Sequence, residues 1–224
     1  SAITITAWFK KVSGSGWMSL VGKGTTDANE EYILMIKDNQ VYFDVGQGGG
    51  PYLQQSTTIS VSVWHHIAAV HTRSGSTSTL KVYLNGKDVG GSTVGASNSP
   101  NDNSHPLTIG SRFSTSNAPF QGQIDEVRIW SETRSQAEIK ANMHTELSGG
   151  ESNLVAYYNF NEGTGTTVSD MSSNSNNGTM TNMANDDWIS NSLFAQDYSL
   201  DLDGSNDYVQ VADDNALDIS SSIT

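Results

Sequence analysis

Short runs of alternating apolar and polar residues, separated by turn sequences, extend along nearly the whole chain. Residues 3–9 alternate with a period of two, which predicts a β-strand with one buried face. Similar runs predict further strands at residues 17–21, 32–36, 41–45, 63–70, 80–84, 107–110, 123–130, 154–160, 198–202 and 208–211. Many short strands joined by glycine-rich turns favour an all-β sandwich.

Turn and capping residues mark the breaks between these strands. Asn85-Gly86 favours positive φ at both residues and therefore a type I′ hairpin turn. Residues 90–105 are rich in Gly, Ser, Asn and Pro, and they predict a loop. Ser135 and Glu138 form a capping-box pattern, in which the serine hydroxyl accepts the Glu138 N–H and the glutamate reaches back. One short helix is therefore expected at about 135–147.

Several sequence blocks are spread over most of the chain. They are Trp-His-His-Ile-Ala at 64–68, Val-Tyr-Leu-Asn-Gly at 82–86, Ile-Asp-Glu-Val-Arg-Ile-Trp at 124–130, Leu-Val-Ala-Tyr-Tyr-Asn-Phe-Asn-Glu-Gly-Thr-Gly at 154–165, Asp-Met-Ser-Ser-Asn-Ser-Asn-Asn-Gly-Thr at 170–179 and Leu-Asp-Gly-Ser-Asn-Asp-Tyr-Val at 202–209. Together they resemble the laminin-G-like, concanavalin A-like domains of bacterial surface proteins, which are related to the pentraxins. The resemblance implies a two-sheet antiparallel jelly-roll sandwich that spans residues 1–224 as a single domain.

The order of these blocks departs from the family. The block at 202–209 usually precedes the strand that matches residues 3–9, and here it comes last. In addition, Ile223-Thr224 repeats Ile3-Thr4. We therefore expect a circularly permuted domain or a piece of a tandem repeat. Residues 197–224 would supply the family's first strands, either within the chain, which would bring Ile219 near Ile3, or to a neighbouring copy.

The charge and residue composition exclude some functions. The net charge is −13 with only 11 Lys and Arg, which argues against nucleic-acid binding because that binding depends on cations facing phosphates. There is no Cys, so neither disulfides nor thiol chemistry are available. No apolar run of 18 residues occurs, and no membrane insertion is expected. This composition suits a secreted or cell-surface protein.

An enzyme has to be considered, because laminarinase-type glucanases share the sandwich that the resemblance implies. Retaining hydrolysis needs two carboxylates about 5–5.5 Å apart. The nearest match is at Asp125 and Glu126, where Gln123 replaces the first glutamate of the usual pattern. Adjacent residues on a strand point to opposite faces, so these two carboxylates are not expected to act together, and neither are His65 and His66 as metal ligands. We predict that the protein is not an enzyme.

Calcium is the cofactor that the loops suggest. Asp170, Ser172, Asn174 and Asn176 place oxygen-bearing side chains at alternate positions of a tight loop, and Ca²⁺ prefers six to eight oxygen ligands. Local Asx-turns would explain the same residues. The resemblance adds further candidate ligands, because the family often holds calcium at a loop rim; they are Asp125, Asp203 and Asp207.

The resemblance to the pentraxins also bears on their two-calcium site. That site needs acidic residues just after the strand at 107–110, and in this chain Arg112 occupies that stretch. Glu30 and Glu31 fall near the other half of the site. The pentraxin-type calcium site is therefore not expected here.

Sugar binding requires exposed aromatic rings together with Asn, Asp and Gln side chains in loops. The aromatic residues in or beside Gly-, Ser- and Asn-rich segments are Trp17, Tyr52, Phe113, Phe120 and Trp188. Each of them could equally serve loop or core packing. The sequence therefore favours a non-catalytic, lectin-like carbohydrate-binding or cell-adhesion module, stabilised by calcium, whose partner is an extracellular glycan or a surface protein. The alternative is a purely structural repeat or fibre subunit that is linked to neighbouring copies by strand exchange.

Overall fold

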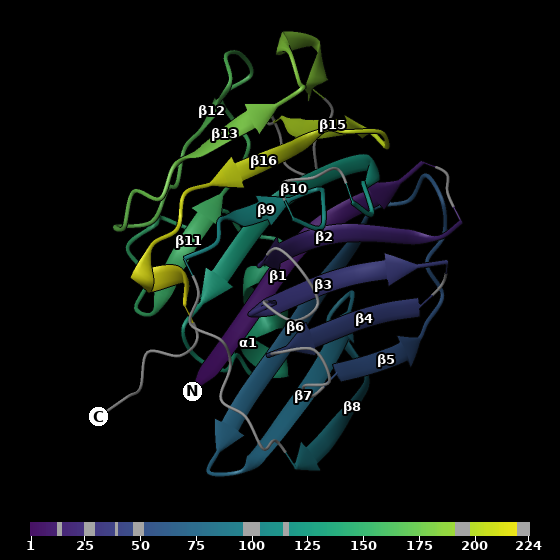
Figure 1. The fold of residues 1–224 in the computed structure, drawn as a ribbon, viewed down its shortest axis with the longest axis vertical. Coiled ribbons are helices and arrows are strands. Elements are labelled where there is room, and N and C mark those ends of the chain that lie inside the picture. Colours follow the sequence, from purple (N-terminus) through teal and green to yellow (C-terminus); the bar gives the residue numbers. More distant parts are fainter. Residues whose placement is uncertain are drawn as a thin grey trace.

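The computed structural model describes residues 1–12, 15–24, 30–38, 40–46, 52–95, 104–113, 117–190 and 198–218. In these residues the chain forms two antiparallel sheets, which confirms the predicted all-β sandwich (Figure 1). Sheet A contains β1 (Ala2–Lys11), β6 (His65–Ser74), β7 (Thr77–Leu84), β8 (Lys87–Gly95), β10 (Gln121–Trp130), β11 (Leu154–Tyr158), β14 (Trp188–Ile189) and β15 (Ser199–Asp203). Sheet B contains β2 (Trp17–Lys23), β3 (Tyr32–Lys37), β4 (Gln40–Val45), β5 (Tyr52–Ser56), β9 (Leu107–Ile109), β12 (Thr167–Val168), β13 (Gly178–Thr181) and β16 (Tyr208–Val211).

The core lies between the two sheets and follows from the period of two. In β4 the side chains alternate between half-buried and buried, so Val41, Phe43 and Val45 enter the core while Gln40 and Tyr42 face outward. Sheet A has the order β14-β15-β10-β1-β6-β7-β8, with β11 also paired to β10, and sheet B has the order β12-β13-β16-β9-β2-β3-β4-β5. Each sheet therefore has a second, outer face, and only these faces and the loops can meet a ligand.

One helix, α1 (Gln136–Asn142), packs on the outer face of sheet A. The predicted capping box is present: the Ser135 hydroxyl accepts the Glu138 N–H at 3.3 Å, and the Glu138 carboxylate accepts the Ser135 N–H at 2.8 Å. Ile139 packs with Ala68, Val70 and Tyr83 of the sheet. The predicted extent of 135–147 was too long, because the helix ends at Asn142.

The turn prediction at Asn85-Gly86 is confirmed, with φ of 51° and 70°. The loop prediction for 90–105 was wrong at its start, because β8 continues through Gly90 and Gly91 to Gly95. This strand pairs with β7 from Lys87 to Gly95, with a bulge at Val89, and Val89 and Val94 pack against the core. The two apolar contacts and the ladder thus outweigh the low strand propensity of glycine.

The C-terminal strands complete both sheets within the chain. β15 pairs with β10 and β16 pairs with β9, which Figure 1 shows as yellow strands beside teal ones. Lys23 fixes the segment that follows β16, because its ammonium lies 2.7 Å from the carboxylate of Asp213 and 2.7 Å from that of Asp218. Ile219 and Ile223 lie outside the described residues, and donation of these strands to a neighbouring copy stays a prediction.

Candidate functional site

On the outer face of sheet A, the end of α1 and the segment after it cover a buried ion pair between Arg128 and Glu126. Arg128 on β10 binds the Glu126 carboxylate, and it also donates to the Asn142 carbonyl at 2.8 Å and the Thr145 carbonyl at 2.7 Å. The Tyr157 hydroxyl donates to the same Glu126 carboxylate at 2.7 Å. Arg128 and Glu126 are 3% and 1% exposed, so the segment after α1 excludes water from this network.

The two carboxylates considered for hydrolysis, those of Asp125 and Glu126, are buried at a bulge in β10. β10 carries one more residue than β1 between its pairings with Thr6 and Trp8, and Glu126 has φ of 53° at this bulge. Asp125 accepts the Glu126 N–H at 2.7 Å and is fully buried. Burial raises the pKa of Glu126 and outweighs Arg128 and Tyr157, which lower it. As folded, neither carboxylate is open to a polysaccharide.

The paired histidines are also enclosed. Burial lowers the pKa of His66 to about 3, and the charges of Arg128 and His144 act in the same direction. His65 accepts the Ser60 N–H at 3.1 Å through its Nε2 atom. In the part of the chain that the structure describes, no group of three or more His, Asp or Glu side chains is placed to hold a metal ion.

The loop predicted to bind calcium is held by the carboxylate of Asp170. Its two oxygens accept the N–H groups of Tyr157, Ser172 and Asn176, each at 2.9 Å, and the Ser172 hydroxyl at 2.8 Å. The Asn174 amide donates to the Val155 carbonyl at 2.8 Å. Hydrogen-bond donors therefore surround the Asp170 oxygens that a cation would need, and this arrangement does not fit a calcium shell. It is the Asx-type loop that the sequence left open.

The second group of predicted calcium ligands lies in a tight turn. The Asp203 N–H donates to Asp207 at 2.9 Å, and the Ser205 N–H donates to Asp203 at 2.7 Å. Burial raises the pKa of Asp207 to about 6; the Asp203 N–H lowers it, but the Asp203 and Asp187 carboxylates add to the increase. Asp125, the third of these predicted ligands, is at the β10 bulge, where its carboxylate accepts the Glu126 N–H.

Arg112 forms an ion pair with one of the two glutamates that fall near the other half of the pentraxin-type site. The Arg112 guanidinium lies 2.9 Å from the Glu30 carboxylate, which is 2% exposed. A side-chain cation thus neutralises the acidic residue that the resemblance assigned to the pentraxin-type calcium site. Glu31 is likewise paired, with Lys23 at 3.1 Å.

Three of the predicted sugar-binding aromatic residues are buried, which corrects their assignment. Phe120 is fully buried and packs edge-on against Phe9, with the ring centroids 6.3 Å apart. Trp188 is 5% exposed and donates its indole N–H to the Gly165 carbonyl at 3.0 Å. Phe113 is 5% exposed and lies under the Arg112 guanidinium. Tyr52 belongs to β5, but its side chain lies outside the described residues.

Trp17 is the predicted aromatic residue that the structure leaves open, at 42% exposure. It lies on the outer face of sheet B at the start of β2, where its ring centroid is 4.3 Å from that of Tyr42 at an interplanar angle of 59°. We call this region the Trp17 face and define it as Trp17, Lys37, Gln40, Tyr42 and Gln54.

Polar side chains continue the Trp17 face across β4 and β5. The Gln40 amide oxygen accepts the Tyr42 hydroxyl at 3.0 Å and the Gln54 amide at 2.9 Å. Gln54 is exposed, and Gln40 and Tyr42 are half-buried. Our sequence reasoning missed Tyr42, Gln40 and Gln54, although the alternation along β4 was the signal that turns two of them outward.

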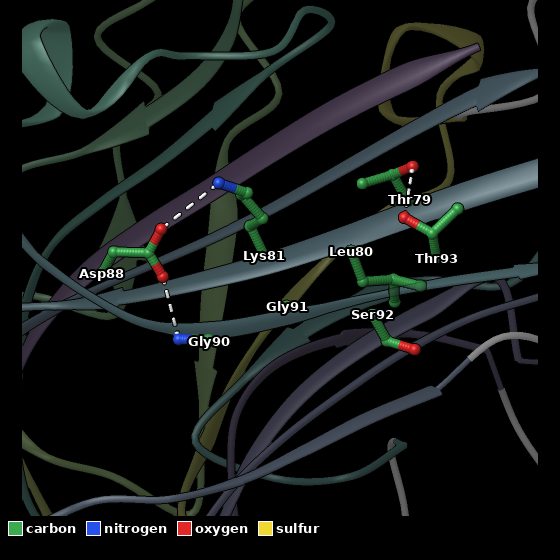
Figure 2. A pocket seen from close by; sticks show the side chains of 8 residues that line it. All are labelled: Thr79, Leu80, Lys81, Asp88, Gly90, Gly91, Ser92 and Thr93. Carbon is green, nitrogen blue, oxygen red and sulfur yellow. Dashed lines mark hydrogen bonds and ion pairs between the residues drawn. The ribbon is translucent and has the colours of Figure 1, made fainter.

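A shallow hollow of about 380 Å³ lies over β7 and β8 (Figure 2). Its polar groups are bound mainly to one another: Lys81 pairs with Asp88 at 3.2 Å, Thr79 bonds Thr93 at 3.2 Å, and Asp88 also accepts the Gly90 N–H. It has no aromatic lining residue. The Trp17 face is therefore the better candidate for a ligand.

The fold and this open aromatic face define a lectin-like β-sandwich. The model of the concanavalin A-like lectin/glucanases superfamily matches residues 1–140, and the chain belongs to this superfamily. No curated protein matches it.

Three solved structures illustrate the shared fold. A candidate carbohydrate-binding protein from Bacteroides ovatus aligns with a TM-score of 0.62 and 23% identity over 80% of this chain and 51% of its own. The CBM40 of the Ruminococcus gnavus IT-sialidase, bound to α2,3 sialyllactose, aligns with a TM-score of 0.50 and 18% identity over 62% of this chain and 81% of its own. The receptor-binding domain of botulinum neurotoxin type G aligns with a TM-score of 0.50 and 11% identity over 82% of this chain and 50% of its own. The chain thus spans about half the length of the first and third of these structures.

Proposed function

We propose that this domain is a non-catalytic glycan-binding module of a secreted or cell-surface protein, and that the sugar lies on the Trp17 face. The observation that most directly supports this proposal is the exposed indole of Trp17 beside Tyr42, with outward-facing amides on the neighbouring strands. An aromatic ring offers the apolar face of a pyranose a stacking surface, and the amides supply hydrogen bonds to its hydroxyls. The carbohydrate-binding descriptions of two of the solved structures support this class of ligand. Among the described residues, no helix is long and apolar enough to cross a membrane.

A glycan array followed by calorimetry with the tightest ligand tests the proposal. Trp17→Ala should weaken binding by about 30-fold or more, because truncating a central tryptophan of a binding site commonly costs about 2 kcal/mol or more. The matched control is Met171→Ala, which removes another exposed apolar side chain, 44% exposed, from the loop near Asp170.

The control should bind like the wild type, and circular dichroism should show both variants folded. Equal affinity of Trp17→Ala and the wild type would rule out this face as the site. If no glycan on the array binds the protein, the alternative of a purely structural repeat or fibre subunit would be favoured instead.

A further inference from the structure

Lys37 lies within the Trp17 face, on β3 between β2 and β4. It pairs across the sheet with Trp17 on one side and with Gln40 on the other. Its Nζ atom lies 5.0 Å from the centroid of the Trp17 ring. A group stacked on or beside this indole would therefore lie within reach of the Lys37 ammonium.

This chain has 24 acidic residues and only 11 Lys and Arg. Among the described residues, the Lys and Arg side chains with a carboxylate partner within 4.0 Å are those of Lys23, Lys81, Arg112, Arg128 and Arg134. Lys37 has no such partner among the described residues.

The nearest carboxylate along the chain, that of Asp38, does not fill this role. It accepts the Gly16 N–H at 3.3 Å, and the Asp38 carbonyl accepts the Lys11 ammonium at 2.6 Å. The turn thus directs Asp38 toward Gly16 and Lys11, while Lys37 remains over the indole. A positive charge beside an open aromatic ring, in a protein whose net charge is −13, is a recognition feature for an anionic group.

We infer that the Trp17 face selects acidic glycans, with Lys37 binding the anionic substituent of a sugar that stacks on Trp17. This inference rests on the proposed function and specifies its ligand class. Carboxylate and sulfate groups project from the edge of a pyranose ring, so stacking of the ring face places them toward the ammonium. Gln40 and Gln54 then bond the uncharged hydroxyls.

Calorimetry with three probes tests the inference: an oligogalacturonide, its fully methyl-esterified form and a sulfated galactan oligosaccharide. The first two share one sugar backbone and differ in charge, and the third distinguishes sulfate from carboxylate recognition. The wild type should bind at least one anionic probe about tenfold more tightly than the ester. Lys37→Met retains an apolar stem on Trp17 and should abolish this preference, so that the acidic probes bind no more tightly than the ester. Lys37→Arg should keep the preference.

Lys87→Met is the matched control, because Lys87 is an exposed cation in the β7–β8 hairpin. It should bind all three probes like the wild type. Equal binding of acid and ester by the wild type, a preference that survives in Lys37→Met, or no binding of any probe would overturn the inference. The proposed function has a separate readout: it fails if Trp17→Ala binds the array's tightest glycan as well as the wild type does.

Discussion

Among the cations that lie over aromatic rings, Arg128 and Lys37 do so at nearly the same distance, on the outer faces of opposite sheets. The Arg128 guanidinium is 5.1 Å from the centroid of Tyr157, and the Lys37 ammonium is 5.0 Å from that of Trp17. Arg128 is 3% exposed and donates to Glu126 and two carbonyls, whereas Lys37 lies beside a half-exposed ring and has no carboxylate partner among the described residues. Protein groups thus pair with the cation at the Arg128 contact, and at the Lys37 contact we propose that a ligand does so.

The largest expected effect on stability comes from removing the buried cation, Arg128. Arg128→Met leaves the Glu126 carboxylate buried without its cation, which commonly costs about 3–5 kcal/mol of unfolding free energy. Lys37→Met should cost less than about 1 kcal/mol, because an exposed charge contributes little to stability. Urea unfolding of both variants provides the measurement.

A double variant distinguishes loss of charge balance from loss of packing. Glu126→Gln with Arg128→Met removes both charges and should regain part of the stability lost in Arg128→Met. If Arg128→Met is as stable as Lys37→Met, the distinction between the two cations is wrong.

Changing Asp170 should also lower the unfolding free energy, but by less than Arg128→Met does. Asp170→Asn keeps the shape of the side chain but turns an NH₂ group toward N–H and O–H donors, so we expect a loss of about 1–3 kcal/mol. Because the protein's own donors satisfy this carboxylate, excess chelator should leave the melting temperature of the wild type unchanged. A chelator-induced decrease that disappears in Asp170→Asn would instead establish the calcium site that the sequence suggested.

Asp207 should show the smallest effect on stability. Its carboxylate accepts one backbone N–H and lies near two other carboxylates, so the protein stabilises its charge only in part. Its pKa is raised from 3.8 to about 6, so folding favours the protonated form. Its contribution to stability is therefore complete below about pH 4 and is lost as the pH rises through 6. Asp207→Asn should remove this loss and melt at a higher temperature than the wild type at pH 7.5.

The measurement is the difference between the two melting temperatures from pH 3.5 to 7.5. It should grow with pH and level off above about pH 7. A difference that is constant over this range would show that Asp207 does not titrate as described.

Local signals allowed the strands, the Asn85-Gly86 turn and the Ser135 cap to be predicted, because each depends on neighbours within a few residues. Burial of the aromatic candidates could not be predicted in this way. Trp17 and Phe120 both lie beside Gly- or Ser-containing segments, but Phe120 packs on Phe9, more than 100 residues away, when the sandwich closes. Tyr42 was missed for the converse reason: it lies within a predicted strand, and its place beside Trp17 depends on the register of β2, β3 and β4.

The most direct test of the Trp17 face follows the indole N–H signals of the chain's 5 tryptophans during titration of isotope-labelled protein with the array's tightest glycan. The account predicts that the Trp17 signal shifts and saturates with the calorimetric affinity. The buried indoles of Trp8, Trp130 and Trp188 should remain nearly unchanged. A Trp17 signal that stays in place while the glycan binds would contradict the account.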